Sequence, residues 1–175
     1  LAPEHSQGGR GMWRLKEDEA KTLGLRVDKN IDERLDPVAS TAAAAKRLSQ
    51  LKSAYGYWTT AMAAHLVGEK LISQAVAEAG GEKDFWKLYL PDGQDTLPAT
   101  VIAGKILYQS PSDFGYHQTS ERAWAPMPTQ RAEVKESTTA RAIASRYKKD
   151  YKTLRDANPH LLTGIVPAGV VVNVP

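Results

Sequence analysis

The sequence contains no cysteine, and this absence excludes disulfide bridges and thiolate metal sites. It also lacks an apolar run of the ~18–20 residues that a membrane-spanning helix needs, the longest apolar stretches being residues 165–174 and 61–67. A phosphate-binding Gly-rich loop, a Gly-x-Ser-x-Gly elbow and a His-Glu-x-x-His motif are all missing. The four histidines are scattered without metal-ligand spacing. We therefore expect no membrane span in this chain, no metal and no cofactor.

The composition is that of a globular protein. Of the 175 residues, 42% are hydrophobic and 25% are charged, which is close to the average for soluble domains. This length allows two small domains. The chain begins with Leu1 and shows no signal-peptide pattern, so we expect it to be processed or incomplete.

Positive charge is concentrated in the C-terminal part. From Arg131 onward the sequence contains eight Lys and Arg residues and four Asp and Glu residues, whereas the whole chain has a net charge of only +3. A basic tail can indicate nucleic-acid binding, but only Tyr147 and Tyr151 are available there for base stacking. We expect a solvated helix face that tolerates an anionic wall polymer, and no nucleic-acid partner.

The first part of the chain reads as short helices that end at glycines. Apolar spacing and capping residues predict helices over residues 11–23, 41–55, 58–66, 69–79 and 96–108. Ser40 is the expected N-cap of the second helix. Residues 26–37 read as a connector, and strand signals are absent from this half. The fold class is therefore expected to be mainly α.

The pattern changes towards the C-terminus. Residues 110–130 combine prolines with aromatic side chains and predict an extended strap. A short strand over 131–134, helices over 139–147 and 151–158, and a β-branched strand over 170–174 then follow. This order is β-α-α-β. The residues expected to form the small core of this region are Ile143, Ala144, Tyr147, Leu154 and Val172.

The last 45 or so residues resemble a LysM module. The matching positions are Val134, Ile143, Ala144, Tyr147, Leu154, Asn158, Pro159, Gly169, Val172, Val174 and Pro175. The resemblance implies a groove for N-acetylglucosamine-containing glycans between two loops. Its residues here would be Ser137, Thr138, Thr139, Asn158, Pro159, His160 and Leu161. The family's Gly-Asp-Thr-Leu in the first loop is Ser-Thr-Thr-Ala here, a change that affects glycan affinity more than the fold. A module that docks only to protein is the alternative.

Residues 1–108 resemble the lytic murein transglycosylases with a goose-lysozyme-like SLT domain of the D type, which precedes LysM modules. The resemblance rests on Gly11, Met12, Trp13, Leu23, Gly24, Leu25, residues 32–37, Ser40, Thr41, Tyr57, Trp58, Ala63, Ala64, Phe85, Trp86, Leu90, Pro91, Asp95 and Thr96. In this family a Glu about fifteen residues before the Gly-hydrophobic-Trp segment protonates the leaving oxygen. That position would fall upstream of Leu1, so we expect the N-terminal catalytic helix to be lacking.

The cleft positions of the family are also altered. The Gln that follows Trp13 is Arg14, the Tyr-Asn pair is His65 and Leu66, a later Gly is Lys70, and the Tyr after Glu-Thr is Ala99. The degenerate cleft would comprise Met12, Trp13, Arg14, His65, Leu66, Glu69, Asp95 and Ala99. Glu4 and Glu69 are the acids nearest to a catalytic position, but neither has the required setting. We expect no catalytic residue among the residues given.

These expectations combine into one organisation. Residues 1–108 would be a lysozyme-like helical domain, 109–130 a strap or linker, and 131–175 a small α+β LysM domain with βααβ order. The predicted function is a peptidoglycan-binding scaffold of the bacterial periplasm or cell envelope, with peptidoglycan glycan strands and other envelope proteins as partners. The alternative is an active lytic transglycosylase that cleaves the β-1,4 bond between N-acetylmuramic acid and N-acetylglucosamine, with its catalytic Glu upstream of residue 1.

Overall fold

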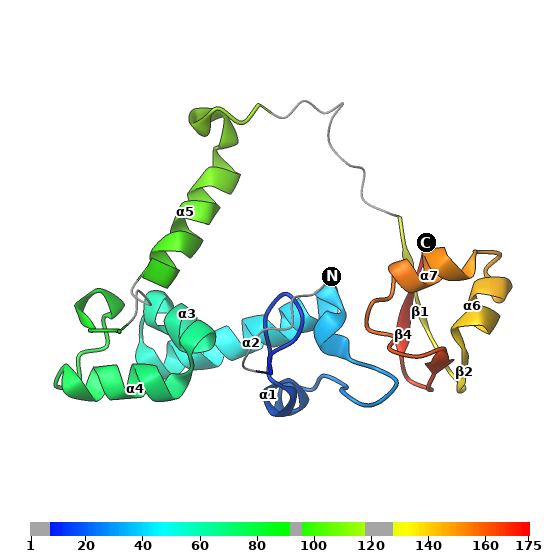
Figure 1. Ribbon diagram of the computed structural model, residues 1–175, viewed down its shortest axis with the longest axis horizontal. Helices are drawn as coiled ribbons and strands as arrows, with labels where there is room; N and C mark the ends of the chain where they lie inside the picture. Colours follow the sequence, from blue (N-terminus) through cyan, green and yellow to red (C-terminus); the bar gives the residue numbers. More distant parts are fainter. Residues whose placement is uncertain (1–7, 92–95, 118–127) are drawn as a thin grey trace. The chain divides into compact units, whose positions relative to one another are not determined.

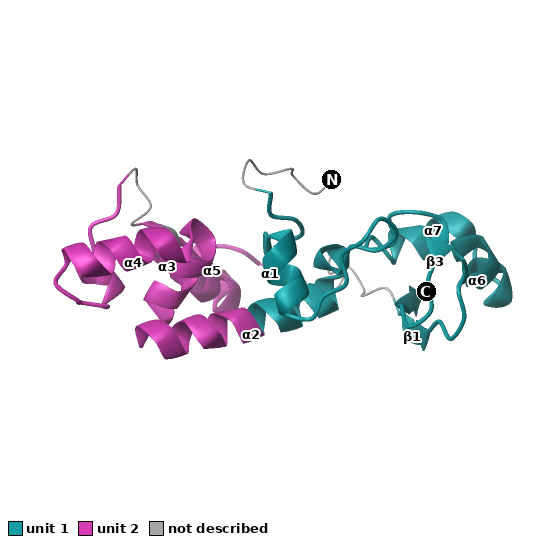
Figure 2. Ribbon diagram, turned by 90° about the horizontal axis from the view of Figure 1, so that it is seen from below, with its two compact units in different colours: residues 1–45, 125–175 teal, residues 46–124 magenta. Residues whose placement is uncertain are grey.

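The computed structural model describes residues 8–91, 96–117 and 128–175. The fold is mainly helical, as expected (Figure 1). The chain divides into two compact units, residues 1–45 with 125–175 and residues 46–124 (Figure 2). Among the described residues, no helix combines the length and the apolar character that crossing a bilayer requires. The division into residues 1–108, 109–130 and 131–175 stays a prediction.

Residues 46–124 form a small helical unit. It contains the second half of α2 (Pro37–Tyr55), then α3 (Trp58–Val67), α4 (Glu69–Glu78), η2 (Phe85–Lys87), α5 (Leu97–Gln109) and η4 (Pro111–Phe114). Alanines of α3 let α4 and α5 pack closely against it. The buried core of this unit consists of Leu51, Tyr55, Ala61, Ala63, Ala64, Ile72, Ala75, Phe85, Leu88 and Leu90.

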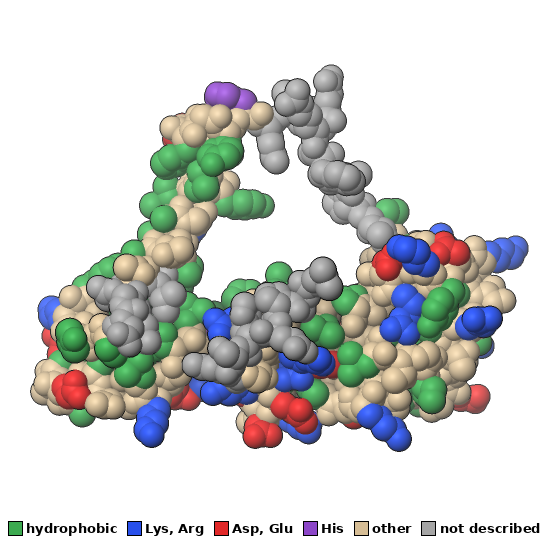
Figure 3. Space-filling view, viewed as in Figure 1, with side chains coloured by type: hydrophobic (Ala, Val, Ile, Leu, Met, Phe, Trp, Pro, Cys, Tyr) green, Lys and Arg blue, Asp and Glu red, His purple; other side chains and the backbone are tan. Residues whose placement is uncertain are grey.

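Helix α5 and the segment that follows it carry exposed apolar side chains. Val101, Ile106 and Tyr108 of α5 are exposed, and so are Phe114 and Tyr116 (Figure 3). The expected strap therefore begins with the short helix η4, and its two described aromatic rings face solvent. The rest of the strap up to residue 127 lies outside the described residues.

Two helix starts differ from the sequence prediction. Helix α2 begins at Pro37, because the Asp36 carboxylate accepts the backbone N–H groups of Val38 and Ala39. The prediction that Ser40 caps this helix was wrong. Ser40 lies inside the first turn, where its hydroxyl donates to the Asp36 carbonyl.

Helix α1 (Glu17–Thr22) begins six residues later than predicted. Residues 11–14 form a turn instead, in which Gly11 and Arg14 adopt positive φ values of 72° and 52°. A Cβ at Gly11 would lie 1.8 Å from the Arg34 carbonyl oxygen. This close approach requires glycine, and it prevents helix α1 from extending to residue 11.

The C-terminal region has the expected strand-helix-helix-strand order. Strand β1 (Gln130–Glu133) pairs antiparallel with β4 (Val171–Val174). Helices α6 (Ala140–Arg146) and α7 (Tyr151–Asp156) lie between these strands in the sequence. A second pair, β2 (Thr138–Thr139) with β3 (Ile165–Val166), was not predicted. Two-residue strands are too short to show an alternating pattern.

The core of this region contains the five predicted side chains. Ile143, Ala144, Leu154 and Val172 are buried, and Tyr147 packs against them half-buried. One member comes from far away in the sequence. Ile31, in the connector before η1 (Glu33–Leu35), is fully buried in the same cluster. The C-terminal region is therefore completed by a residue about 100 positions before β1.

Candidate glycan-binding site

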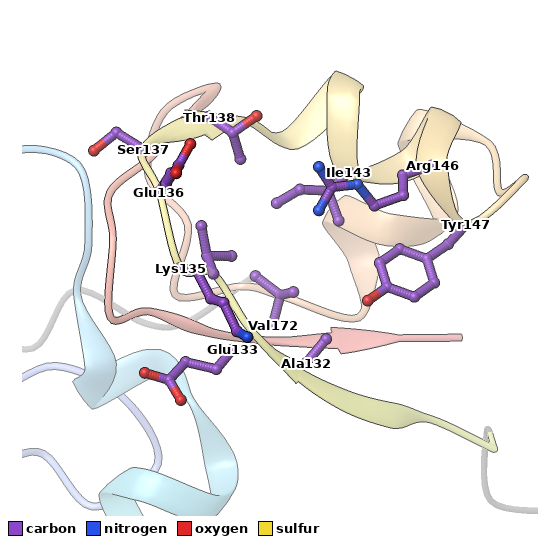
Figure 4. A pocket seen from close by; sticks show the side chains of 11 residues that line it. Ala132, Glu133, Lys135, Glu136, Ser137, Thr138, Ile143, Arg146, Tyr147 and Val172 are labelled. Carbon is purple, nitrogen blue, oxygen red and sulfur yellow. The ribbon is translucent and has the colours of Figure 1, made fainter.

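A pocket of about 600 Å³ opens between β1 and α6 (Figure 4). Its floor is apolar, because Val134, Ile143 and Val172 contribute buried side chains from the end of β1, from α6 and from β4. The remaining lining residues are Ala132, Glu133, Lys135, Glu136, Ser137, Thr138, Arg146 and Tyr147. A volume of this size is typical of small-ligand sites.

The pocket rim is polar and its charges balance. Figure 4 shows Arg146 and Tyr147 coming from the end of α6, whereas Glu136, Ser137 and Thr138 come from the segment between β1 and α6. Two cations, Lys135 and Arg146, accompany two anions, Glu133 and Glu136. Among the described residues, none of these four forms an ion pair within 4.0 Å. The rim thus offers both donors and acceptors to a ligand.

The first predicted loop supplies part of this pocket. Ser137 and Thr138 line it, whereas Thr139 caps α6 by accepting a 3.2 Å hydrogen bond from the Ala142 N–H group. The Ser137 hydroxyl accepts a 3.3 Å bond from the Ala168 N–H group. The sequence analysis did not assign Glu136, Arg146 and Tyr147 to a site, although they also line the pocket. The spacing of Ile143, Arg146 and Tyr147 on one helix face was the available signal.

Asn158, in the second predicted loop, is buried and binds the edge of β4. Its side-chain amide donates to the carbonyls of Leu154, at 2.7 Å, and Asn173, at 2.6 Å. Its side-chain oxygen accepts the Asn173 N–H group at 2.7 Å. Asn158 thus pairs with β4 as a neighbouring strand would, and its polar atoms are already used within the fold.

His160 is also buried against β4. Its Nε2 lies 3.1 Å from the Val171 carbonyl oxygen, and its Nδ1 lies 3.6 Å from a carboxylate oxygen of Asp36. Burial lowers the pKa of His160 below its usual value, and the nearby Asp36 charge offsets only part of this effect. The ring is therefore held neutral within the fold, where it donates to Val171 if Nε2 carries the proton.

The connector covers the rest of the second loop. Ile31 forms an antiparallel bridge with Leu161, which is also buried. The Leu162 N–H group donates to the Asn30 carbonyl at 2.8 Å, and the Asp32 N–H group donates to the His160 carbonyl at 2.9 Å. Of the four predicted positions in this loop, only Pro159 is exposed. The structure therefore separates the two predicted groups of glycan contacts into an open loop and a covered one.

An ion-pair network holds the connector in shape. Arg34 donates through Nε and Nη2 to the two carboxylate oxygens of Asp32, each at 2.8 Å, and both side chains are almost fully buried. Arg10 adds a 3.2 Å bond to the same carboxylate. Burial raises the pKa of Asp32, but the charges and hydrogen bonds of Arg34 and Arg10 outweigh it and hold the pKa below its usual value.

Three predicted cleft residues lie in the turn before α1. Met12 is 70% exposed, and Arg14 is exposed with positive φ. Trp13 is half-buried, and its Nε1 donates to the Thr41 hydroxyl at 2.8 Å. The turn thus presents a methionine and an arginine to solvent beside a tryptophan fixed on α2.

The other predicted cleft residues belong to the helical unit, except Asp95, which lies outside the described residues. His65 and Leu66 are half-buried near the end of α3, and Ala99 is exposed on α5. Glu69 begins α4 and forms an ion pair with Arg47. A carboxyl that is 46% exposed and paired with a cation lacks the apolar setting that a general acid of this class requires. Within the described ranges, no group of three or more metal-ligating side chains comes together.

Comparison with known proteins finds similarity in the first part of the chain. Residues 4–88 match the Transglycosylase SLT domain model. Membrane-bound lytic murein transglycosylase D from Escherichia coli K12 is 31% identical over 105 residues, which cover 57% of this chain and 23% of that protein. The protein of the same name from Escherichia coli O6:H1 matches equally. The chain thus spans about a quarter of the length of these curated relatives. Residues 4–88 are therefore similar in sequence to a transglycosylase SLT domain.

Proposed function

We propose that this protein binds peptidoglycan without cleaving it. The C-terminal region would act as a LysM-type glycan-binding module, and the transglycosylase-like domain would act as a scaffold that contacts glycan strands and other envelope proteins. One observation carries the proposal. A sequence similar to an SLT domain is combined with a β-α-α-β region whose pocket has both apolar and polar lining residues. This function places the protein in the bacterial periplasm or cell envelope.

The proposed lack of cleavage rests on the surroundings of the acidic side chains in the described part of the chain. Glycan cleavage in this class needs a carboxylic acid whose pKa is raised by an apolar cleft. Glu69 is the acid at the predicted cleft, and it is partly exposed and paired with Arg47 instead of lying in an apolar cleft. The replacement of family cleft residues by Arg14, His65 and Ala99 supports the same conclusion.

A sedimentation assay with purified, insoluble sacculi tests the proposal. We expect the chain to co-sediment with sacculi and to release no soluble muropeptides after prolonged incubation. The Escherichia coli K12 transglycosylase D serves as the positive control for release. Failure to co-sediment would refute peptidoglycan binding, and release of muropeptides by residues 1–175 would refute the non-catalytic role.

An active lytic transglycosylase is the second candidate. It is favoured by the similarity of residues 4–88 to the SLT domain and by the similarity to relatives named as lytic murein transglycosylases. Under this alternative, a Glu encoded upstream of Leu1 would cleave the β-1,4 bond. Sequencing the coding region upstream of Leu1, followed by a muropeptide-release assay on the longer protein, distinguishes the two candidates.

A further inference from the structure

The turn that joins α6 to α7 gathers exposed cations (Figure 1). Arg146, Lys148 and Lys149 are all exposed, and we call these three residues the basic turn. Among the residues that the structure describes, none of the three forms an ion pair. The acid that follows them, Asp150, caps α7 instead: its carboxylate accepts the Thr153 N–H group at 2.7 Å and the Thr153 hydroxyl. The charges of the basic turn are therefore open to a partner.

Lys148 occupies a backbone conformation that favours glycine. Its φ is 54°, in the left-handed region. The N–H groups of Lys148 and Lys149 donate to the carbonyls of Ser145, at 3.1 Å, and Ala144, at 2.9 Å. Helices that end with this pair of hydrogen bonds usually have glycine at the left-handed position, because a Cβ there is strained. The sequence thus keeps a lysine where the backbone energy favours glycine.

The position of Lys149 is also unfavourable for folding. Lys149 directly precedes Asp150, the N-cap of α7, and the N-terminus of a helix disfavours a nearby cation. The C-terminus of α6 does favour a cation, but Arg146 in its last turn already supplies one. The stability of the two helices therefore does not explain Lys148 and Lys149. Positions that are kept against the local folding energy indicate an interaction.

The surroundings of the basic turn select the class of anionic partner. A single-stranded nucleic acid needs exposed aromatic faces for base stacking. Here the guanidinium groups of Arg141 and Arg155 already lie 5.9 Å from the centroid of the Tyr151 ring, and Tyr147 packs against the core. An anionic strand bound along a groove is not favoured either, because the lysines lie outside the pocket lining. Cations at one exposed turn can instead all meet a flat anionic surface.

We propose that the basic turn docks the protein on a lipid surface that contains anionic headgroups. The ammonium groups of Lys148 and Lys149 lie among the headgroup phosphates, and no segment of the turn has to enter the bilayer. Each cation near such a surface raises partitioning about fivefold, and salt screens the attraction. Neither lysine lines the pocket, so this inference goes beyond the proposed function and does not depend on glycan binding.

Sedimentation of the full chain with lipid vesicles tests the inference. The anionic vesicles contain phosphatidylcholine and about one-third phosphatidylglycerol, and vesicles of phosphatidylcholine alone are the neutral control. At about 0.1 M salt we expect binding to the anionic vesicles only, and at about 0.5 M salt we expect this binding to be lost, because the screening length becomes shorter. Equal binding to neutral vesicles, or binding that salt does not weaken, would overturn an electrostatic contact with headgroups.

Lys148→Gly separates a binding role from a structural role. It removes one charge and relieves the left-handed strain, so the melting temperature should rise while partitioning into anionic vesicles falls about fivefold. Lys149→Gln should lower partitioning by a similar factor without lowering the melting temperature. A lower melting temperature for Lys148→Gly, or unchanged partitioning for both variants, would overturn the proposal.

Lys29→Gln is the matched control. Lys29 is exposed in the connector, and the substitution removes the same charge from outside the basic turn. Its partitioning should stay within about twofold of that of the unmodified protein, because headgroup attraction falls off within a screening length of about 10 Å. Losses equal to those of Lys148→Gly would assign the attraction to net charge and overturn the role of the turn.

Soluble polyanions give the last comparison. Long-chain inorganic polyphosphate and duplex DNA are titrated at the phosphate concentration of the anionic vesicles. Tighter binding to either polymer than to the vesicles, weakened by Lys148→Gly, would reassign the turn to a soluble polyanion and overturn the lipid surface. If the proposal holds, anionic bicelles should shift the amide resonances of residues 146–149 and leave the Lys29 amide unchanged.

Discussion

The two loops that flank the helices of the C-terminal region contain similar polar residues but differ in whether these residues are exposed or buried. The segment between β1 and α6 leaves Glu136 and Ser137 exposed beside a pocket. The loop after α7 instead buries Asn158 and His160 against β4 and lies under the connector. The tertiary structure therefore leaves polar groups of the first loop exposed, whereas it uses those of the second loop within the fold.

This difference predicts opposite responses to mutation. Substitutions in the covered loop or in the connector over it should lower the free energy of unfolding. Substitutions in the open loop should affect binding and leave the free energy of unfolding nearly unchanged. The following changes test that contrast, in order of decreasing expected effect.

Arg34→Met should give the largest loss of stability. It leaves the Asp32 carboxylate, which is 1% exposed, without its bidentate partner. Breaking one side of a buried ion pair costs about 3–5 kcal/mol. The free energy of unfolding is measured by urea titration. Arg10→Met is the control, because Arg10 is half-exposed and its removal should cost about 1 kcal/mol or less. Equal losses for the two variants would contradict a buried network.

Ile31→Ala should destabilise the C-terminal core although the residue lies far outside it in the sequence. Removing a fully buried Ile side chain costs about 2–5 kcal/mol. Hydrogen exchange at the Leu162 amide should accelerate, because that amide donates to Asn30 beside the substitution. Val38→Ala, an aliphatic truncation at an exposed site, should change stability by about 0.5 kcal/mol or less. Unchanged exchange at Leu162 would show that the connector does not cover the loop.

Asn158→Ala should cost about 2 kcal/mol, because it removes three hydrogen bonds and leaves the Asn173 N–H group without its acceptor. Asn158→Asp keeps that acceptor but places a buried carboxylate oxygen against the Leu154 and Asn173 carbonyl oxygens, so a loss at least as large as that of Asn158→Ala is expected. Thermal unfolding monitored by circular dichroism compares the variants. A Asn158→Ala variant that is as stable as the unmodified protein but fails to bind sacculi would reassign Asn158 to the binding surface.

His160→Gln should alter the pH dependence of stability. The pKa of His160 is lowered in the folded state, so the unfolded state binds more protons once the pH falls below the ordinary value of about 6.5. Stability should therefore be complete above that pH and should decrease as the pH falls towards the lowered pKa. The amide of Gln can still donate to the Val171 carbonyl but does not titrate. The difference in melting temperature between the two proteins should shrink from pH 7.5 to pH 5, and a constant difference would contradict a buried neutral ring.

Glu136→Gln should have the smallest effect on stability. The side chain is exposed at the open loop, and an isosteric change there should alter the free energy of unfolding by about 0.5 kcal/mol or less. Urea titration beside Asn158→Asp, which makes a carboxylate from an amide in the covered loop, gives a direct comparison. Similar losses at the two positions would remove the distinction between the loops.

Much of the fold followed from local sequence signals. Apolar spacing placed the cores of α2, α3 and α4, and glycines placed the ends of the predicted helices within a few residues. The five-residue core around Ile143 was confirmed. The start of α1 was wrong, because the Cβ clearance at Gly11 depends on Arg34, a residue 23 positions later. Local propensity carries no information about such a contact.

The candidate site was predicted only in part. Ser137 and Thr138 line the pocket as two of the expected contacts, whereas Arg146 and Tyr147 were read as a surface cation and a core aromatic. Whether a half-buried tyrosine faces a pocket depends on how α6 packs on β1. Whether the side chains of Asn158 and His160 are exposed or buried depends on which segment covers them.

The sequence by itself determined the helical character of the first part, the strand-helix-helix-strand order of the last part and the chemical types present at each position, because these depend on neighbours a few residues apart. Only the tertiary structure decided that Ile31 completes the C-terminal core and that the connector lies over His160 and Leu161. Contacts between residues more than 100 positions apart are selected by the burial of apolar surface and the pairing of buried polar groups throughout the folded chain.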